Sequence, residues 1–276
     1  MSLRAISLAL SMLFLTACMA DQAVELESRP IALDQNAEPA GPQSAASVAN
    51  LLPGTGPTYV TLTIAEHDTG ITAASSGRNA TTPITSGSGF VVSADGYVIT
   101  AAHVGVAKGN EVSARAANGR IYSGTVVGLL PENDMALIKL RSFSGRAVNP
   151  AAPGCVANGD LLYTLGKPHG GGDTARIGTL QTKHFGRPVT YGKFGYPDAL
   201  VLHMGTQRGE SGGPVYNSKG QLVGMVVSTL SDSSGQSINL AHAIPANTIG
   251  KFFCNQTTSC GPQWSSLAVL PVDGCA

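Results

Sequence analysis

Short runs of apolar and β-branched residues recur along the chain from Tyr59 onward, separated by turn signals. The run at 59–64 is followed by two runs on either side of Asp95-Gly96, a dipeptide typical of a hairpin turn. Further runs of the same kind occupy 124–127, 135–140, 161–165, 199–202 and 221–227. Strands this short and numerous favour a β-sandwich or β-barrels. The pattern therefore predicts an all-β domain.

The first residues have a different character. Arg4 precedes an apolar run from Ala5 to Leu15. This run is shorter than the roughly 20 residues that a membrane-spanning helix needs, but it suits the core of a signal peptide. It ends in Leu15-Thr16-Ala17-Cys18, which resembles a bacterial lipobox. We therefore expect residues 1–17 to be a lipoprotein signal peptide and Cys18 to carry the lipid that attaches the protein to a membrane.

The alternative for this segment is a plain signal peptide, cut after Ala17 or Ala20. If Cys18 is lipidated, the protein is expected in the bacterial envelope, facing the periplasm. Met19 follows Cys18, in place of the Asp that marks inner-membrane retention in some bacteria. The sequence thus favours the outer membrane.

Two further segments flank the β-rich region. Residues 18–57 lack periodicity and are rich in Ala, Pro, Gln, Asn and Gly, so a flexible tether is expected there. The alternative is an extra strand or a short helix around Ala45 to Leu52. Residues 253–276 form a cysteine-containing tail with the single tryptophan, Trp264.

Composition excludes several classes of protein. Lys plus Arg and Asp plus Glu both total 17, and only 12% of residues are charged. A chain with no net charge has no field to hold phosphates, which argues against a nucleic-acid partner. The 34 glycines argue against a helical bundle, because each costs about 1 kcal/mol in a helix interior. A hydrophobic content of 43% excludes wholesale disorder.

Five cysteines leave one unpaired if the others form disulfides. Lipidation of Cys18 leaves an even set that is compatible with two disulfides in three possible connectivities: Cys155, Cys254, Cys260 and Cys275. Four of the six histidines are scattered along the chain without the spacing of metal ligands: His67, His169, His184 and His203. Neither a metal nor another cofactor is therefore expected.

Three segments carry the residue types that acyl transfer requires. His103 ends a predicted strand, Asp134 precedes an apolar strand, and Ser211 lies in the turn Gly209-Glu210-Ser211-Gly212-Gly213-Pro214. The reaction needs a hydroxyl nucleophile, a base to take its proton, and a carboxylate to orient that base. It also needs backbone N–H groups directed at the oxyanion, which converge only in an unobstructed turn. We expect the N–H groups of Gly209 and Ser211 to be these donors.

A rival interpretation is an α/β-hydrolase, because Gly209–Gly213 fits the G-x-S-x-G pattern, with Asp232 and His242 following in the expected order. That fold places its serine between a strand and a helix. Here the residues from Val215 to Val227 indicate a hairpin, which disfavours it. Helix content measured by circular dichroism would separate the two folds.

Longer stretches around the three segments have a recognisable form. They are Ser86-Gly87-Ser88-Gly89-Phe90-Val91-Val92-Ser93, Asp95-Gly96-Tyr97-Val98-Ile99-Thr100, His103-Val104, Asp134-Met135-Ala136-Leu137-Ile138-Lys139-Leu140, Gly166-Lys167-Pro168, Gly209-Glu210-Ser211-Gly212-Gly213-Pro214-Val215 and Ala243-Ile244-Pro245. On these stretches, from about Tyr59 to Gly250, the sequence resembles the trypsin-like serine endopeptidases of the chymotrypsin fold, and among them the HtrA/Deg branch.

The resemblance implies two six-stranded antiparallel β-barrels, at about 58–147 and 155–250 of a domain spanning 58–252, with the active site in the cleft between them. It implies a serine endopeptidase acting on polypeptides, with His103 as base and acid, Asp134 as its orienting carboxylate and Ser211 as nucleophile. The alternative function is a catalytically inactive, protease-like binding lipoprotein. Labelling of Ser211 by a fluorophosphonate probe would discriminate the two.

The chain departs from the HtrA/Deg pattern in two ways. Only about 25 residues follow the domain, so no PDZ domain is expected. Glu210 replaces the Asp or Asn of the wider family, where zymogens pair that acid with a newly cut N-terminus. Nothing of that kind precedes Tyr59, so activity without such cleavage is expected, and the longer Glu210 leaves the conformation of the oxyanion loop open.

The resemblance also locates the primary specificity pocket. Its base falls near Gly205, with Thr206 and His242 as candidate lining residues. An acidic residue is absent from this position, so a preference for Lys or Arg is not expected. A pocket without fixed charge gains mainly from apolar burial and favours small or medium apolar side chains. The alternatives for His242 are recognition of an acidic substrate residue or a packed pocket wall.

Overall fold

The computed structural model describes residues 30–34, 42–65, 83–234 and 236–275. Six antiparallel strands close into barrel one in the order β2-β3-β4-β7-β6-β5. The strands are β2 (Tyr59–Ala65), β3 (Pro83–Val91), β4 (Tyr97–Ala101), β5 (Glu111–Ala116), β6 (Ile121–Leu130) and β7 (Met135–Leu140). In β5 and β6 buried residues alternate with more exposed ones, as expected for strands with one face in a barrel core.

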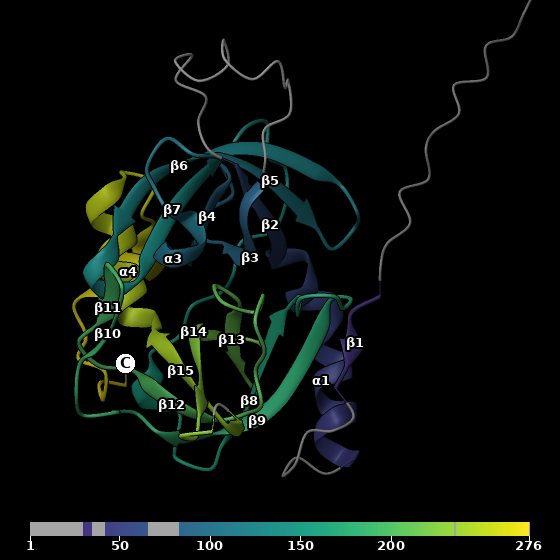
Figure 1. Cartoon of the computed structure of the whole chain (residues 1–276), viewed down its shortest axis with the longest axis vertical. Coiled ribbons are helices and arrows are strands. Elements are labelled where there is room, and N and C mark those ends of the chain that lie inside the picture. The colour runs from purple at the N-terminus through teal and green to yellow at the C-terminus, as the bar shows by residue number, and fades with distance from the viewer. Residues whose placement is uncertain (1–29, 35–41, 66–82, 235, 276) are drawn as a thin grey trace, which may run out of the picture.

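Barrel two is built from β8 (Leu161–Gly166), β9 (Thr174–Thr182), β12 (Leu200–His203), β13 (Pro214–Asn217), β14 (Leu222–Ser231) and β15 (Ser237–Pro245). Its order is β9-β12-β15-β14-β13-β8, and pairing of β8 with β9 closes the ring. The predicted pair of six-stranded antiparallel barrels is confirmed. Figure 1 shows barrel one above barrel two, with the loops that carry the candidate residues in the region between them.

A small hairpin stands outside both barrels. It is formed by β10 (Val189–Tyr191) and β11 (Phe194–Tyr196), within the connection between β9 and β12. β11 packs against η2 (Pro131–Asn133), a single turn of 3₁₀-helix in barrel one. The hairpin thus belongs to barrel two in sequence and contacts barrel one.

The expectation of a flexible tether over 18–57 is wrong for the part that the structure describes. There the chain forms β1 (Ala32–Leu33), α1 (Pro42–Thr55) and η1 (Gly56–Thr58). Val48 of α1 is fully buried, and Thr55 accepts a 3.2 Å hydrogen bond from the hydroxyl of Tyr163 on β8. Packing on barrel two stabilises a helix that its own sequence signals only weakly, as is common in proteins. Residues 1–29, including Cys18, lie outside the described residues.

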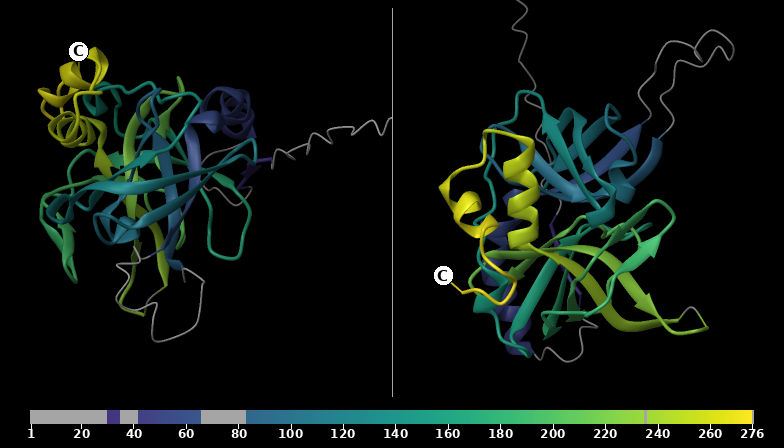
Figure 2. Two further views of the ribbon diagram at one scale, coloured as in Figure 1. Left: turned by 90° about the horizontal axis from the view of Figure 1, so that it is seen from above. Right: turned by 90° about the vertical axis from the view of Figure 1, so that its left-hand side faces the viewer.

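The C-terminal tail is also structured. α4 (Ala246–Gln256) and α5 (Pro262–Ala268) lie on the outside of the barrels (Figure 2). Trp264 is buried and donates its indole N–H to the Val92 carbonyl of barrel one at 3.0 Å.

Two disulfides select one of the three open connectivities. Cys155 pairs with Cys275, and Cys254 pairs with Cys260. Within the described ranges, no helix has the length and apolar character needed to cross a membrane.

Candidate active site

The pairing of β4 with β7 brings the candidate histidine and aspartate together. Ala101, the last residue of β4, lies opposite Met135, the first residue of β7. His103 follows on α3 (Ala102–Gly105), a single turn at the edge of barrel one that faces barrel two (Figure 1). Asp134 immediately precedes β7 in the left-handed conformation, with φ of 47°.

The Asp134 carboxylate holds His103 at two points. Oδ2 lies 2.8 Å from the histidine Nδ1, and Oδ1 accepts the histidine backbone N–H at 2.9 Å. The Asp134 side chain is fully buried, whereas the His103 side chain is 27% exposed. A buried carboxylate at Nδ1 fixes a tautomer in which Nε2 is free to accept a proton.

The hairpin β10–β11 supplies a third donor that the sequence did not reveal. The Tyr191 hydroxyl donates to Oδ2 of Asp134, and burial raises the pKa of Tyr191 far above its ordinary value. The rings of Tyr191 and Phe194 lie edge-on to His103, at centroid distances of 5.9 and 6.4 Å. The hairpin therefore covers the His103–Asp134 pair and completes the hydrogen bonding of the carboxylate.

The nucleophile loop is tied to both barrels. Ser211 accepts the N–H of Ser88 on β3 through its carbonyl at 2.9 Å, while the N–H of Gly212 donates to Val226 of β14 at 2.8 Å. Gly212 has φ of +83°, and a Cβ there would lie 2.2 Å from the Ser88 carbonyl and 2.3 Å from Thr100 Oγ1. Only glycine fits at this close approach to the strand that leads to His103.

In the described chain His103 is hydrogen-bonded to Asp134, whose carboxylate accepts, but no hydrogen bond joins His103 to the Ser211 hydroxyl. Such bonds are often long without substrate and shorten in the substrate complex. The two expected oxyanion donors, the N–H groups of Gly209 and Ser211, have no partner among the described hydrogen bonds. Gly209 has φ of +95°, a conformation that side-chain-bearing residues rarely adopt.

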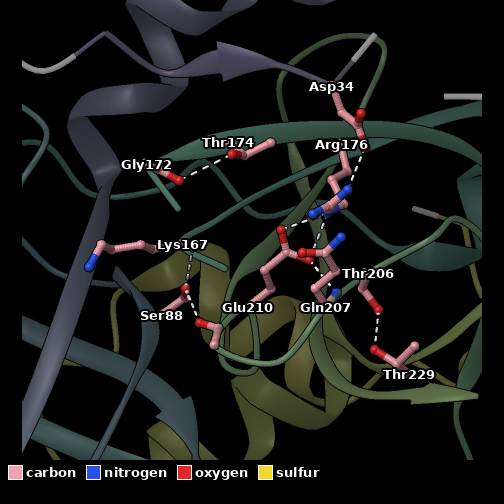
Figure 3. Close-up of polar contacts among 11 residues, drawn as sticks. Asp34, Ser88, Lys167, Gly172, Thr174, Arg176, Thr206, Gln207, Glu210 and Thr229 are labelled. Carbon is pink, nitrogen blue, oxygen red and sulfur yellow. Dashed lines mark hydrogen bonds and ion pairs between the residues drawn. The ribbon is translucent and has the colours of Figure 1, made fainter. Parts of the chain in front are cut away.

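Glu210, whose length left the loop conformation open, is fully buried and has a defined partner. Arg176 on β9 donates Nε–H to both carboxylate oxygens, at 2.6 and 2.8 Å. Burial raises the pKa of Glu210, and Arg176 opposes that shift. Figure 3 shows the arginine between Glu210 and Asp34. No local motif predicts this pair, because its members lie far apart in the chain.

The candidate pocket residues lie on neighbouring strands and loops. Thr206 is buried and its hydroxyl lies 2.7 Å from that of Thr229 on β14 (Figure 3). A Cβ at Gly205 would lie 2.9 Å from the Asn239 side chain. On the adjacent β15, His242 is opposite Ser228 of β14.

His242 is fully buried, and its Nδ1 lies 2.8 Å from the Tyr196 hydroxyl. Its ring packs on that of Phe185, with a centroid distance of 4.2 Å, and Nε2 lacks a hydrogen-bond partner among the described residues. Burial lowers the pKa of His242, so the imidazole is neutral at pH 7. A neutral ring in this setting offers no charge to an acidic ligand.

The other described histidines are dispersed. His169 is 3.4 Å from the Ser86 hydroxyl, and His184 lies between the carboxylates of Asp198 and Asp273. Within the described ranges, no group of three or more His, Cys, Asp or Glu residues is arranged to hold a metal ion. His67 is outside those ranges.

Comparison with known proteins agrees with this geometry. Residues 87–225, just over half of the chain, match the family described as the trypsin-like peptidase domain. A probable periplasmic serine endoprotease, DegP-like, from Brucella suis biovar 1 (strain 1330) is 32% identical over 168 residues, which are 60% of this chain and 32% of that protein. A protein of the same description from Rhizobium meliloti (strain 1021) is 32% identical over 197 residues, or 69% of this chain and 37% of that protein. The chain thus spans about a third of the length of these curated relatives.

Solved structures show the same fold. The HtrA-type protease AlgW with a tripeptide matches with a TM-score of 0.59 at 26% identity, over 71% of this chain and 59% of that one. A variant of AlgW with a decapeptide matches with a TM-score of 0.61 at 24% identity, over 75% and 65% of the two chains, and supports the fold alone.

Proposed function

We propose that this chain, which belongs to the trypsin-like peptidase family, is a serine endopeptidase that hydrolyses polypeptides through Ser211, His103 and Asp134. One observation carries the proposal: a fully buried carboxylate holds the Nδ1 side of a partly exposed histidine on one barrel. The glycine-rich serine loop comes from the other barrel and is bonded to β3 of the first. The family and the DegP-like relatives support this assignment.

In the first step, His103 takes the proton of the Ser211 hydroxyl through Nε2 as the oxygen attacks the scissile carbonyl. Asp134 stays ionised and stabilises the imidazolium. The N–H groups of Gly209 and Ser211 stabilise the oxyanion. His103 then protonates the leaving amine, and water, activated by the same histidine, hydrolyses the acyl-enzyme.

For the substrate, we favour small or medium apolar side chains in the primary pocket near Gly205 and Thr206. The hydroxyls of Thr206 and Thr229 are hydrogen-bonded to each other at one wall. The neutral, tyrosine-bonded state of His242 favours its role as a packed wall over recognition of an acidic residue. Cleavage of a peptide library, with the preferred residue before the cut identified by mass spectrometry, tests this preference.

For location, lipidation at Cys18 and attachment in the envelope facing the periplasm remain part of the proposal, with the outer membrane favoured. The names of the DegP-like relatives support a periplasmic location. A Cys18→Ala variant is expected to move from the membrane fraction to the soluble periplasmic fraction. Mass spectrometry of the mature wild-type protein should find a lipid on Cys18, and an unmodified Cys18 would exclude the lipid anchor.

Labelling by a fluorophosphonate probe tests the enzymatic assignment. The wild-type chain should label and cleave casein, and Ser211→Ala should do neither. Ser218→Ala, which alters an exposed serine in the β13–β14 turn, is the matched control and should label like wild type. A folded wild-type chain that neither labels nor cleaves would favour the inactive binding protein instead.

A further inference from the structure

The residue before the nucleophile is the most enclosed acidic group beside the site. Glu210 is fully buried and accepts three hydrogen bonds at 2.6 to 2.8 Å, two from Arg176 and one from the backbone N–H of Gln207. Charge-assisted bonds of this length are among the stronger ones in proteins. A Cβ at Gly166 would lie 2.8 Å from Cβ and Cγ of Glu210, so the glutamate stem packs directly on the backbone of β8. The side chain has little freedom to move.

This carboxylate organises the loop that carries the oxyanion donors. Gln207 donates its N–H to Glu210 Oε2, and the backbone N–H of Glu210 returns to the Gln207 carbonyl at 3.1 Å. Both ends of the segment 207–210 are therefore attached to one another, with Gly209 between them at φ of +95°. Glycine accepts either sign of φ at similar cost, so Gly209 alone does not fix the direction of its peptide group. The Glu210 anchor removes that freedom.

The anchor depends on Arg176. This arginine is only 7% exposed, and its side chain bridges two acids: Nε–H donates to Glu210, and Nη1 donates to Asp34. A buried carboxylate that loses its cation is strongly destabilised and either takes up a proton or moves toward solvent. Movement would release Gln207 and the loop that follows, and protonation would replace a charged acceptor with a neutral one and so weaken its bond to Gln207.

Asp34 is in turn placed by backbone pairing. Its N–H donates to the Ala175 carbonyl at 2.9 Å, and Ala32 donates to the Asp173 carbonyl at 2.9 Å. These bonds attach β1 in parallel to β9, the strand that carries Arg176. A continuous polar path thus runs from the segment 30–34 through Arg176 and Glu210 to the nucleophile loop (Figure 3).

We infer that Arg176 is a positioning residue for the oxyanion hole, and that Asp34 orients it, so that residues 30–34 belong to the catalytic unit. The inference rests on the proposed function and extends it to a segment outside both barrels. It assigns Arg176 no contact with substrate. The residue acts by holding the Gly209 and Ser211 N–H groups toward the position of the oxyanion.

The test compares steady-state kinetics of the full chain with those of its variants on one peptide substrate. Loss of one oxyanion donor lowers kcat by about 10²–10³-fold. Arg176→Met should approach that loss, with KM changed by less than about threefold, because the oxyanion forms after substrate binds. The rate of fluorophosphonate labelling should fall in parallel, since its phosphoryl oxygen needs the same donors. Asp34→Asn should lower kcat by about tenfold, the equivalent of one weakened charge-assisted bond.

A double variant separates positioning from simple damage to the fold. Arg176→Met with Glu210→Gln removes both buried charges but keeps an acceptor for the Gln207 N–H. It should recover at least about tenfold of the kcat lost in Arg176→Met, because the fully buried carboxylate that lost its cation has been replaced by a neutral amide. Asp34 also loses Arg176, but its side chain is 18% exposed and reaches solvent. Thermal unfolding of each variant shows that it is folded at the assay temperature. If Arg176→Met does not fold, Asp34→Asn carries the test, and wild-type kcat in Asp34→Asn then overturns the inference.

Arg115→Met is the matched control. Arg115 forms a similar two-oxygen ion pair with the buried Asp173, at 3.0 and 2.9 Å, and neither side chain is hydrogen-bonded to the nucleophile loop within the described residues. This variant should lower the unfolding temperature while kcat stays within about twofold of wild type. Wild-type kcat in Arg176→Met, or an equal loss in Arg115→Met, would overturn the inference. Absence of turnover and labelling in the wild-type chain would instead overturn the proposed function.

Discussion

The hydroxyl of Tyr191 provides a test of how the proposed catalytic carboxylate, Asp134, is held. Asp134 is fully buried and accepts three hydrogen bonds from the described residues: two from His103 and one from Tyr191. Tyr191→Phe deletes the third donor and keeps the ring that packs on His103. A hydrogen bond to a charged group contributes about 1.5–3 kcal/mol, so the variant should lose that much free energy of unfolding.

The effect on turnover should be smaller than the effect on stability. In the proposed mechanism Asp134 carries the same charge before and during the reaction, so the Tyr191 hydrogen bond stabilises the ground state and the transition state alike. The bond lowers the activation free energy only to the extent that it orients Asp134 toward His103. A loss of 1.4 kcal/mol corresponds to about tenfold in rate, and we expect kcat to fall by no more than that.

The measurement uses two backgrounds. Unfolding by urea is followed in chains that also carry Ser211→Ala, which prevents self-cleavage, and kcat is measured with Ser211 intact. Tyr122→Phe is the control, because its buried hydroxyl donates to the neutral carbonyl of Ser144 at 3.0 Å, in barrel one. It should lose about 0.5–1.5 kcal/mol and keep wild-type kcat. Equal stability losses in the two variants, or a thousandfold lower kcat in Tyr191→Phe, would refute this account of Asp134.

The remaining predictions concern the tail. Cys155–Cys275 joins residues 120 positions apart, and Cys254–Cys260 joins residues 6 positions apart. By the entropy of loop closure, replacing the first pair with serine should lower the free energy of unfolding by about 2.5 kcal/mol more than replacing the second. Urea unfolding measures both losses, and equal losses would contradict the entropic explanation. Hydrogen bonds that the His184 ring donates to the carboxylates of Asp198 and Asp273 raise its pKa above the ordinary value of 6.5. The stabilising contribution of His184 is therefore complete below pH 6.5 and is lost as pH rises through the raised pKa. The stability difference between wild type and His184→Gln should therefore shrink from pH 6 to pH 9, and a difference that grows with pH would reverse the sign of this linkage.

Local sequence signals predicted an all-β domain and the candidate chemical groups because those signals are properties of short segments, whereas the two barrels were implied by the family resemblance. Asp95-Gly96 marks a hairpin by its own turn preference. The turn around Ser211 needs a residue at positive φ at position 212, and the sequence has glycine there. Strand alternation is equally local. These features can be recognised without knowing which strands pair.

The N-terminal helix α1 and the contacts of Tyr191 and Arg176 could not be predicted from short segments of the sequence. α1 has Pro53 near its end and no strong apolar face, and it is stabilised by packing on barrel two. Tyr191 lies 57 positions from Asp134, and Arg176 lies 34 positions from Glu210. Their contacts depend on strand register and on the docking of one barrel on the other, so nothing within a short window distinguishes them from ordinary surface residues.

The positioning residues share a relation to one strand. Arg176 lies on β9, Asp34 follows the strand β1 that pairs with β9, and Tyr191 belongs to the hairpin that follows β9 in the chain. One strand of barrel two therefore supports both the oxyanion loop and the carboxylate of barrel one. β9 is itself held by pairing with β8, β12 and β1. A shift of β9 would alter oxyanion stabilisation and the orientation of Asp134 together, whereas a local change at either group would alter only one of them.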